Sequence, residues 1–502
     1  MSRENIGMLA GLFVFAIIVL MPTPDGMPVE AKFTAAVATL MAIWWMTEAV
    51  PIPVTSLLPI FLFPVFGVTP GTQVTLSYAN NLIYLYMGGF LIAVAMEKWN
   101  LHRRIALHTI QFIGITPNRI VLGFMIATGF LSMWVSNTAA AMMMVTIAMA
   151  VVTQVSNEVN ADENSNVDTR PGHFRFGAAL MLGIAYSASI GGVATLVGTP
   201  TNAVFAGVVQ STYGISINFL EWMKIGFPLA VVTLFITWWY LVKVAFPSEI
   251  SQLPGGRETI HKEIKLLGRM GKEEKIVFAV FGTVALLWIL RGFIKIEALR
   301  MVEDSTIAIA GALLLFLIPS NFKKREFVLD WDSAVKIPWD ILLLFGGGFA
   351  LATAFADSGL TNYLAIKLTV LEGTSIFLII PIVVTLVIFL TELTSNTATN
   401  SIMLPIMGAL AQAMQIHPYG LMIATTITAS YAFMLPVATP PNAIVFGTRY
   451  VTIKQMIKAG FWLNIISIFL ISLVVLFLLP ALWDIDLSTL PAEFLTPTAA
   501  GG

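Results

Sequence analysis

The chain has 502 residues, of which 57% are hydrophobic and only 11% are charged, so it carries less than half the charge that soluble domains place on their surfaces. This composition excludes an ordinary soluble enzyme, and the net charge of −1 excludes a nucleic-acid-binding protein, which needs a basic field. The chain also has no cysteine, which excludes disulfide frameworks and thiolate metal sites.

Apolar stretches long enough to cross a bilayer recur along the chain. The N-terminal one is too long for a signal-peptide core and no A-x-A site follows it, so it counts as the first helix. Two further stretches, 119–152 and 376–414, are interrupted in the middle, and we expect each to form a re-entrant helical hairpin. We therefore predict an all-α polytopic membrane protein with eleven transmembrane helices, at 5–22, 33–50, 53–67, 82–97, 176–208, 226–246, 275–295, 305–319, 338–356, 420–447 and 459–483.

The distribution of basic residues supports this topology. With the N-terminus in the cytoplasm, most of the 27 Lys and Arg residues fall in cytoplasmic loops, as the positive-inside rule requires. Counting either hairpin as a full span would scramble the distribution. Two hydrophilic loops, 153–175 and 247–275, then lie on the cytoplasmic side. The second has the charge spacing of a helix, and it is either a solvated connector or an amphipathic surface helix.

The chain repeats itself. Residues 86–90 (YMGGF) match 345–349 (FGGGF), and the tripeptide SNT at 136–138 recurs at 395–397 with the same separation and no gap. Each SNT stands at the interruption of a predicted hairpin. The predicted topology gives the two halves opposite orientations. An inverted repeat with paired broken segments is typical of secondary transporters, and it places the binding site where the interruptions meet near the midplane.

A second pair of motifs extends the repeat: GTPTN at 198–202 matches ATPPN at 438–442. The repeat divides the chain into an N-terminal helix and loop, a first half with its hairpin, a cytoplasmic connector, a second half with its hairpin, and a C-terminal tail. These segments are expected at 1–32, 33–246, 247–275, 276–483 and 484–502.

The interruptions leave backbone groups unpaired at membrane depth, which is tolerated only beside protein or a wet cavity. Hydroxyl and amide side chains there donate to an anion and accept toward a cation. Ser132 precedes Ser136 by one helical turn and Thr391 precedes Ser395 likewise, which supplies the uncharged oxygens that suit sodium. No Lys or Arg lies within either motif, so co-bound cations would neutralise an anionic substrate. Glu392, beside the second tip, is either a proton or cation partner or a residue that faces a polar interface and tunes the site.

These paired motifs resemble those of the divalent anion/sodium symporter family, and the resemblance covers nearly the whole chain. It implies a bacterial inner-membrane homodimer with scaffold and transport domains that moves as an elevator. It also implies two sodium ions, the first at Ser132, Ser136, Asn137 and Gly198, and the second at Thr391, Thr394, Ser395, Asn396 and Ala438. The implied substrate contacts are Ser136, Asn137, Thr138, Ser395, Asn396 and Thr397, flanked by Thr439 and Pro440.

The resulting hypothesis is sodium-coupled uptake of a C4-dicarboxylate such as succinate, fumarate or malate. A citrate or sulfate symporter and a dicarboxylate exchanger on the same fold remain alternatives. An intramembrane enzyme is disfavoured because the sequence has no paired carboxylates, HExxH motif or Ser/His set at membrane depth. An open channel suits two hairpins from opposite faces less well than alternating access does.

Overall fold

The computed structural model describes residues 2–114, 116–162, 167–250, 256–293 and 301–495. Within them the chain is helical apart from one short antiparallel pair, β1 (Pro319–Asn321) with β2 (Glu326–Phe327). In this described part, eight helices are long and apolar enough to cross a membrane, or nine if one pair bent by 118° counts as a single span. The chain is therefore a polytopic helical membrane protein, although helix length and composition alone identify fewer than the eleven predicted spans.

The first half of the chain contains α1 to α12. Their bounds are α1 Arg3–Leu20, α2 Val29–Thr47, α3 Ile52–Thr55, α4 Leu58–Val65, α5 Gly71–Ser77, α6 Asn81–Lys98, α7 Leu101–Ile113, α8 Pro117–Ser132, α9 Asn137–Ala161, α10 Arg175–Val193, α11 Pro200–Tyr213 and α12 Phe219–Tyr240.

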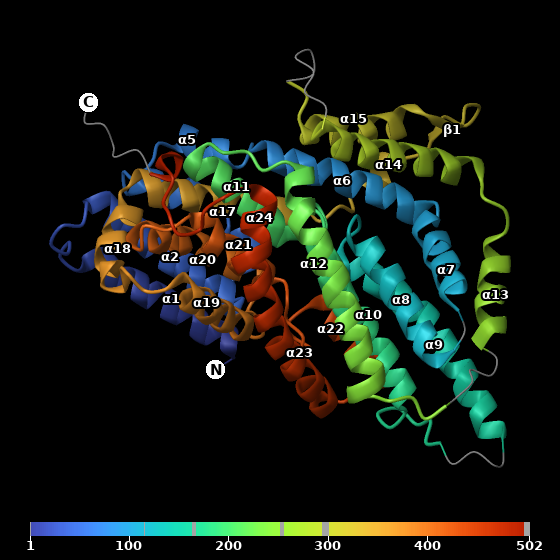
Figure 1. The fold of residues 1–502 in the computed structure, drawn as a ribbon. Coiled ribbons are helices and arrows are strands. Elements are labelled where there is room, and N and C mark those ends of the chain that lie inside the picture. Colours follow the sequence, from blue (N-terminus) through green and yellow to red (C-terminus); the bar gives the residue numbers. More distant parts are fainter. Residues whose placement is uncertain (1, 115, 163–166, 251–255, 294–300, 496–502) are drawn as a thin grey trace.

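The second half contains α13 to α24 and the two strands. The helices are α13 Gly256–Leu267, α14 Lys272–Arg291, α15 Asp304–Leu317, α16 Trp331–Ala334, α17 Trp339–Asp357, α18 Leu360–Leu368, α19 Ile376–Thr391, α20 Asn396–Ala413, α21 Pro418–Ala429, α22 Pro440–Gly447, α23 Ile453–Leu473 and α24 Leu479–Trp483. Figure 1 shows α2, α18 and α20 packed together at one side of the molecule, and α7, α8, α9 and α13 at the other.

Three expected spans were wrong as single helices. The stretch 53–67 divides into α3 and α4, 176–208 divides into α10 and α11, and 420–447 divides into α21 and α22. In the last two, the second helix begins at a proline that follows a threonine in extended conformation. A proline has no N–H and disfavours helix at the residue before it, so the chain unwinds upstream of Pro200 and Pro440.

Two helical hairpins occupy the interrupted stretches. Residues 133–136 join α8 to α9, and residues 392–395 join α19 to α20. Each hairpin packs against the broken helix pair that follows it, α8 and α9 against α10, and α19 and α20 against α21. The most apolar window of α10 is completely buried. The same local arrangement is therefore built twice, as the repeat predicts.

The polar segments differ in part from expectation. The predicted loop 153–175 was wrong at its start, because α9 continues as helix to Ala161. The segment 247–275 does contain a helix, α13, which packs on α7 and α9. Glu263 of α13 pairs with Arg103, and Glu274 pairs with Arg104 at 2.6 Å. Parts of the predicted segments, at 163–166, 251–255, 294–295 and 496–502, lie outside the described residues.

Candidate functional site

The first hairpin tip is organised around Ser132 and Asn137. Ser132 is the last residue of α8. Its hydroxyl donates toward the Asn137 side-chain oxygen and lies 2.7 Å from the carbonyl oxygen of Ala188 in α10. Ser136 caps α9 by accepting a hydrogen bond from the Ala139 N–H at 3.3 Å. Asn137, the first residue of α9, thus faces back across the tip toward α8 and α10.

The second tip repeats this geometry. Thr391 is the last residue of α19. Its hydroxyl lies 2.7 Å from the Asn396 side-chain oxygen and 2.9 Å from the carbonyl oxygen of Ala429 in α21. Asn396 is the first residue of α20 and therefore stands where Asn137 stands in the first half. The two halves share the contact between hydroxyl, amide and carbonyl, although the hydroxyl belongs to serine in one and threonine in the other.

At both tips a single buried hydroxyl faces two carbonyl-type oxygens. Ser132 and Thr391 are fully buried, and each hydroxyl has one proton but faces two carbonyl-type oxygens. One acceptor at each tip is therefore without that proton at any moment. A small cation coordinated by neutral oxygens would satisfy such a cluster. Within the described residues, no group of three His, Asp or Glu side chains is placed to hold a metal ion.

The unwound segments between the broken helices are held by two buried asparagines. The Asn202 amide donates to the carbonyl of Thr195 at 2.7 Å, and the Asn442 amide donates to those of Ala432 and Leu435 at 3.0 Å. Sequence reasoning matched these residues within the GTPTN and ATPPN motifs but assigned them no role. Their side chains replace backbone hydrogen bonds that the missing helical turns would have made.

Gly198 allows its segment to approach the first tip. A Cβ at Gly198 would lie 2.4 Å from the Gly192 carbonyl oxygen and 3.0 Å from that of Ser132. A Cβ at Gly192 would lie 2.7 Å from the Asn137 side-chain oxygen. Both positions therefore require glycine for the backbone to pack against the first tip.

Each tip is also tied to its unwound segment, by different chemistry. At the first, the Thr195 hydroxyl donates to the Met133 carbonyl at 2.6 Å. At the second, the buried Glu392 carboxylate accepts hydrogen bonds from three consecutive backbone N–H groups, those of Phe433, Met434 and Leu435, at 2.7, 2.9 and 3.1 Å. The Asn464 amide donates to the same carboxylate at 2.9 Å. Glu392 thus holds the segment that carries Ala438.

One cavity brings both motifs and both unwound segments together. Its volume is about 550 Å³, within the range of about 300–1,000 Å³ typical of small-ligand sites. The predicted residues that line it are Ser136, Asn137, Thr138, Gly198, Thr394, Ser395, Asn396, Thr397, Ala438, Thr439 and Pro440. Ser132 and Thr391 lie behind this lining, buried next to the two asparagines.

The lining hydroxyls are not equivalent. Ser395 makes no capping hydrogen bond at the start of α20, unlike Ser136 at the start of α9. The Thr394 hydroxyl lies 2.9 Å from the Leu390 carbonyl of α19 and 2.6 Å from the Thr399 hydroxyl of α20, so the two helices that flank it already engage it. The second tip therefore offers a freer hydroxyl at Ser395 than at Thr394.

Sequence reasoning missed three charged residues that line this cavity, Arg3, Glu48 and Asp340. The guanidinium of Arg3 donates to the carbonyl of Leu393 in the second tip at 2.9 Å and to the carbonyl of Met46. These residues come from the ends of α1, α2 and α17, far from either motif in the sequence. Neither motif contains a Lys or Arg, but the folded cavity does acquire one positive charge.

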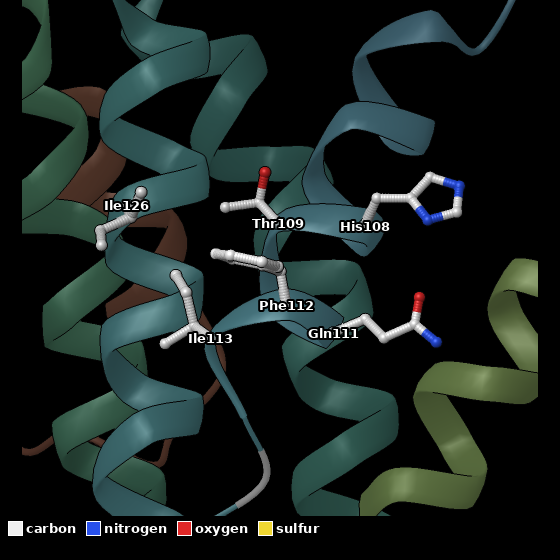
Figure 2. A pocket seen from close by; sticks show the side chains of 6 residues that line it. All are labelled: His108, Thr109, Gln111, Phe112, Ile113 and Ile126. Carbon is white, nitrogen blue, oxygen red and sulfur yellow. The ribbon is translucent and has the colours of Figure 1, made fainter.

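A second hollow lies elsewhere, between α7 and α8 (Figure 2), with a volume of about 920 Å³. The residues that line it are His108, Thr109, Gln111, Phe112, Ile113 and Ile126. Figure 2 shows the side chains of His108 and Gln111 pointing away from Ile126. None of the repeated motif residues reaches this hollow, so the smaller cavity between the two tips is the candidate site.

Comparison with known proteins identifies the family of this chain. The family model described as the sodium:sulfate symporter transmembrane region matches residues 2–485. This chain belongs to the sodium:sulfate symporter family. The resemblance read from the paired motifs is thereby confirmed, and the family is one of membrane transporters, not enzymes.

Curated relatives within the family match along nearly their whole length. A protein of Staphylococcus saprophyticus named sodium-dependent dicarboxylate transporter SdcS is 45% identical over 489 residues, which are 97% of this chain and 93% of the relative. A protein of the same name from Staphylococcus aureus (strain bovine RF122) is 44% identical over 490 residues, with the same coverage of both chains.

Two solved structures share the fold at low identity. The Neisseria gonorrhoeae MtrF structure aligns with a TM-score of 0.56 and 12% identity, over 95% of this chain and 96% of that one. The Alcanivorax borkumensis YdaH transporter aligns with a TM-score of 0.53 and 12% identity, over 80% and 86% of the two chains. These likenesses concern the architecture of the helices alone.

Proposed function

We propose that this member of the sodium:sulfate symporter family is a secondary active transporter that couples the uptake of C4-dicarboxylates, such as succinate, fumarate and malate, to sodium. The observation that carries the proposal is the doubled contact of a buried hydroxyl with an asparagine and a helix carbonyl, at Ser132 and at Thr391. Relatives named as sodium-dependent dicarboxylate transporters support it, because they align over 97% of this chain.

Two sodium ions occupy the tips in this proposal. The first uses Ser132, Ser136, Asn137 and Gly198, and the second uses Thr391, Thr394, Ser395, Asn396 and Ala438. The two carbonyl-type oxygens that face each buried hydroxyl support both assignments. The buried site has few fixed charges, so each ion adds a positive charge beside a dianion and favours joint occupancy.

The substrate carboxylates bind between the tips in the cavity of about 550 Å³. Their partners are the hydroxyls and amides of the two SNT motifs, with Thr439 and Pro440 at the edge. The helices α9 and α20 begin at these motifs, and the free N–H groups and positive dipole ends of helix N-termini favour anions.

Transport proceeds by alternating access in an elevator-type motion, with a transport domain that contains both hairpins moving against a scaffold. The chain crosses a bacterial inner membrane eleven times, with two re-entrant hairpins, a cytoplasmic N-terminus and a homodimeric assembly. With that orientation, the exposed Arg3, Glu48 and Asp340, which line the cavity, lie on its cytoplasmic side.

The test is uptake of radiolabelled succinate into proteoliposomes, with an inward sodium gradient or with potassium in its place. We expect accumulation only with the sodium gradient. Sodium-independent exchange of internal for external succinate would refute the symporter. Excess unlabelled citrate and sulfate should compete poorly, and stronger competition by either than by malate would change the assigned substrate.

A further inference from the structure

Tyr86 joins α6 to the unwound segment of the first half. Its side chain is 1% exposed. Its hydroxyl lies 2.6 Å from the carbonyl oxygen of Leu196 and 2.5 Å from that of Thr199. These two carbonyls flank Gly198, which packs against the tip that carries Ser132. A single side chain from outside the hairpin thus reaches the backbone on both sides of the proposed cation ligand.

The segment between α10 and α11 has few other restraints. Residues 194–199 lie outside both helices, so their carbonyls lack the donors that a continuing helix would supply. The Thr195 hydroxyl and the Asn202 amide hold the segment near Thr195. At its far end, the Thr199 carbonyl accepts a hydrogen bond from the Asn202 N–H at 3.1 Å, and the Thr199 hydroxyl lies 3.5 Å from that of Ser430. Tyr86 adds a restraint from α6 that reaches the carbonyls on both sides of Gly198.

In the second half, the unwound segment is held in place without a tyrosine hydroxyl. Phe345 occupies the matching place in the repeat, and its ring packs edge-on against Tyr86 at 4.9 Å between centroids. There the Glu392 carboxylate holds the unwound segment from the hairpin tip itself. The first cation segment is thus tied to α6, whereas the second is tied to its own hairpin.

We propose that Tyr86 is a positioning residue for the first sodium site, fixing the Gly198 segment so that its carbonyl meets an ion beside Ser132 and Asn137. A phenol hydroxyl has one proton and faces two carbonyls, so it restrains both while leaving acceptor capacity for a cation. The inference rests on the proposed sodium coupling. It adds that α6, which belongs to neither hairpin, sets the affinity of the first site.

The test compares Tyr86→Phe with Tyr186→Phe. Both tyrosines are buried, but the Tyr186 hydroxyl has no hydrogen-bond partner among the described residues. Each change removes one oxygen and keeps the ring, so folding is preserved and is checked by thermal melting. The first readout is the increase in melting temperature when sodium chloride replaces choline chloride, a measurement that requires no transport. The second is the sodium concentration for half-maximal succinate uptake.

We expect Tyr86→Phe to raise the half-maximal sodium concentration about threefold to tenfold, the value of one neutral hydrogen bond. Succinate affinity at saturating sodium should stay unchanged, and Tyr186→Phe should behave as wild type. An unchanged sodium dependence in Tyr86→Phe would overturn the positioning role while leaving the symporter intact. A wild-type protein that sodium does not stabilise would instead overturn both the sodium site and the inference that rests on it.

Discussion

Replacing Glu392 by glutamine should weaken sodium binding at the second site without unfolding the protein. The carboxylate accepts four hydrogen bonds, three from backbone N–H groups and one from Asn464. A glutamine oxygen can keep the three that converge on Oε1, but its NH₂ group faces the Leu435 N–H, which then has no acceptor. Bonds to a charged acceptor are worth about 1 kcal/mol more than neutral ones.

Three weakened bonds and one orphaned N–H would cost about 5 kcal/mol, and relief from burying a charge offsets roughly half of it. The remaining cost of about 2 kcal/mol falls on the segment that carries Ala438. If that segment must be ordered for sodium to bind, the sodium concentration for half-maximal succinate uptake rises about 30-fold.

A matched control is Asp304→Asn. Asp304 is also a buried carboxylate that accepts a backbone N–H, that of Phe219 at 2.8 Å, but it pairs with Arg291 away from the cavity. The Asp304→Asn substitution should lower the melting temperature and leave the sodium dependence of uptake unchanged. If Glu392→Gln alters sodium dependence no more than Asp304→Asn does, the carboxylate does not organise the second site and the reasoning fails.

Three further predictions concern other residues. Asn137→Ala and Asn396→Ala should each reduce uptake about 100-fold, with melting temperature and assembly retained, and wild-type uptake by either would mean that the motifs are structural. Arg3→Met should lower the uptake rate about threefold, because it frees the second tip from α2, whereas Arg3→Lys should retain most of the wild-type rate. Equal rates in the two variants would show that this contact does not contribute to transport. Burial lowers the pKa of His417, at the turn between α20 and α21, to about 4 from an ordinary value near 6.5. The unfolded chain therefore binds the proton first as the pH falls, and melting temperature should drop between about pH 6.5 and 4; a slope of equal size in His417→Gln would contradict this.

The doubled motifs are the part of the site that sequence alone could predict. Ser132 and Thr391 each stand one turn before an SNT, and that spacing brought hydroxyl and asparagine together in both halves. The interrupted apolar stretches gave the bounds of the second hairpin closely, whereas the first hairpin extends past its expected end at 152, because α9 continues to Ala161. Repetition supplied the signal for the doubled motifs, because a local pattern that occurs twice in register constrains where the chain must break.

Long-range contacts with the backbone left no such signal. Tyr86 and Arg3 act on carbonyl oxygens of Leu196, Thr199 and Leu393, and every residue type offers the same carbonyl. The residue types at those positions therefore do not indicate which side chain binds the carbonyl. The two spans that break at Thr-Pro steps were predicted as single helices, since apolar composition continues through the unwound segments and only the steps at 199–200 and 439–440 mark them.

The central claim is that sodium completes the dicarboxylate site, and equilibrium binding tests it most directly. Succinate affinity is measured on the purified protein by calorimetry across a range of sodium concentrations, with choline chloride keeping the ionic strength constant. The account predicts that succinate binds weakly without sodium and progressively tighter as sodium rises, and that succinate tightens sodium binding by the same factor. Succinate affinity that is independent of sodium would contradict it.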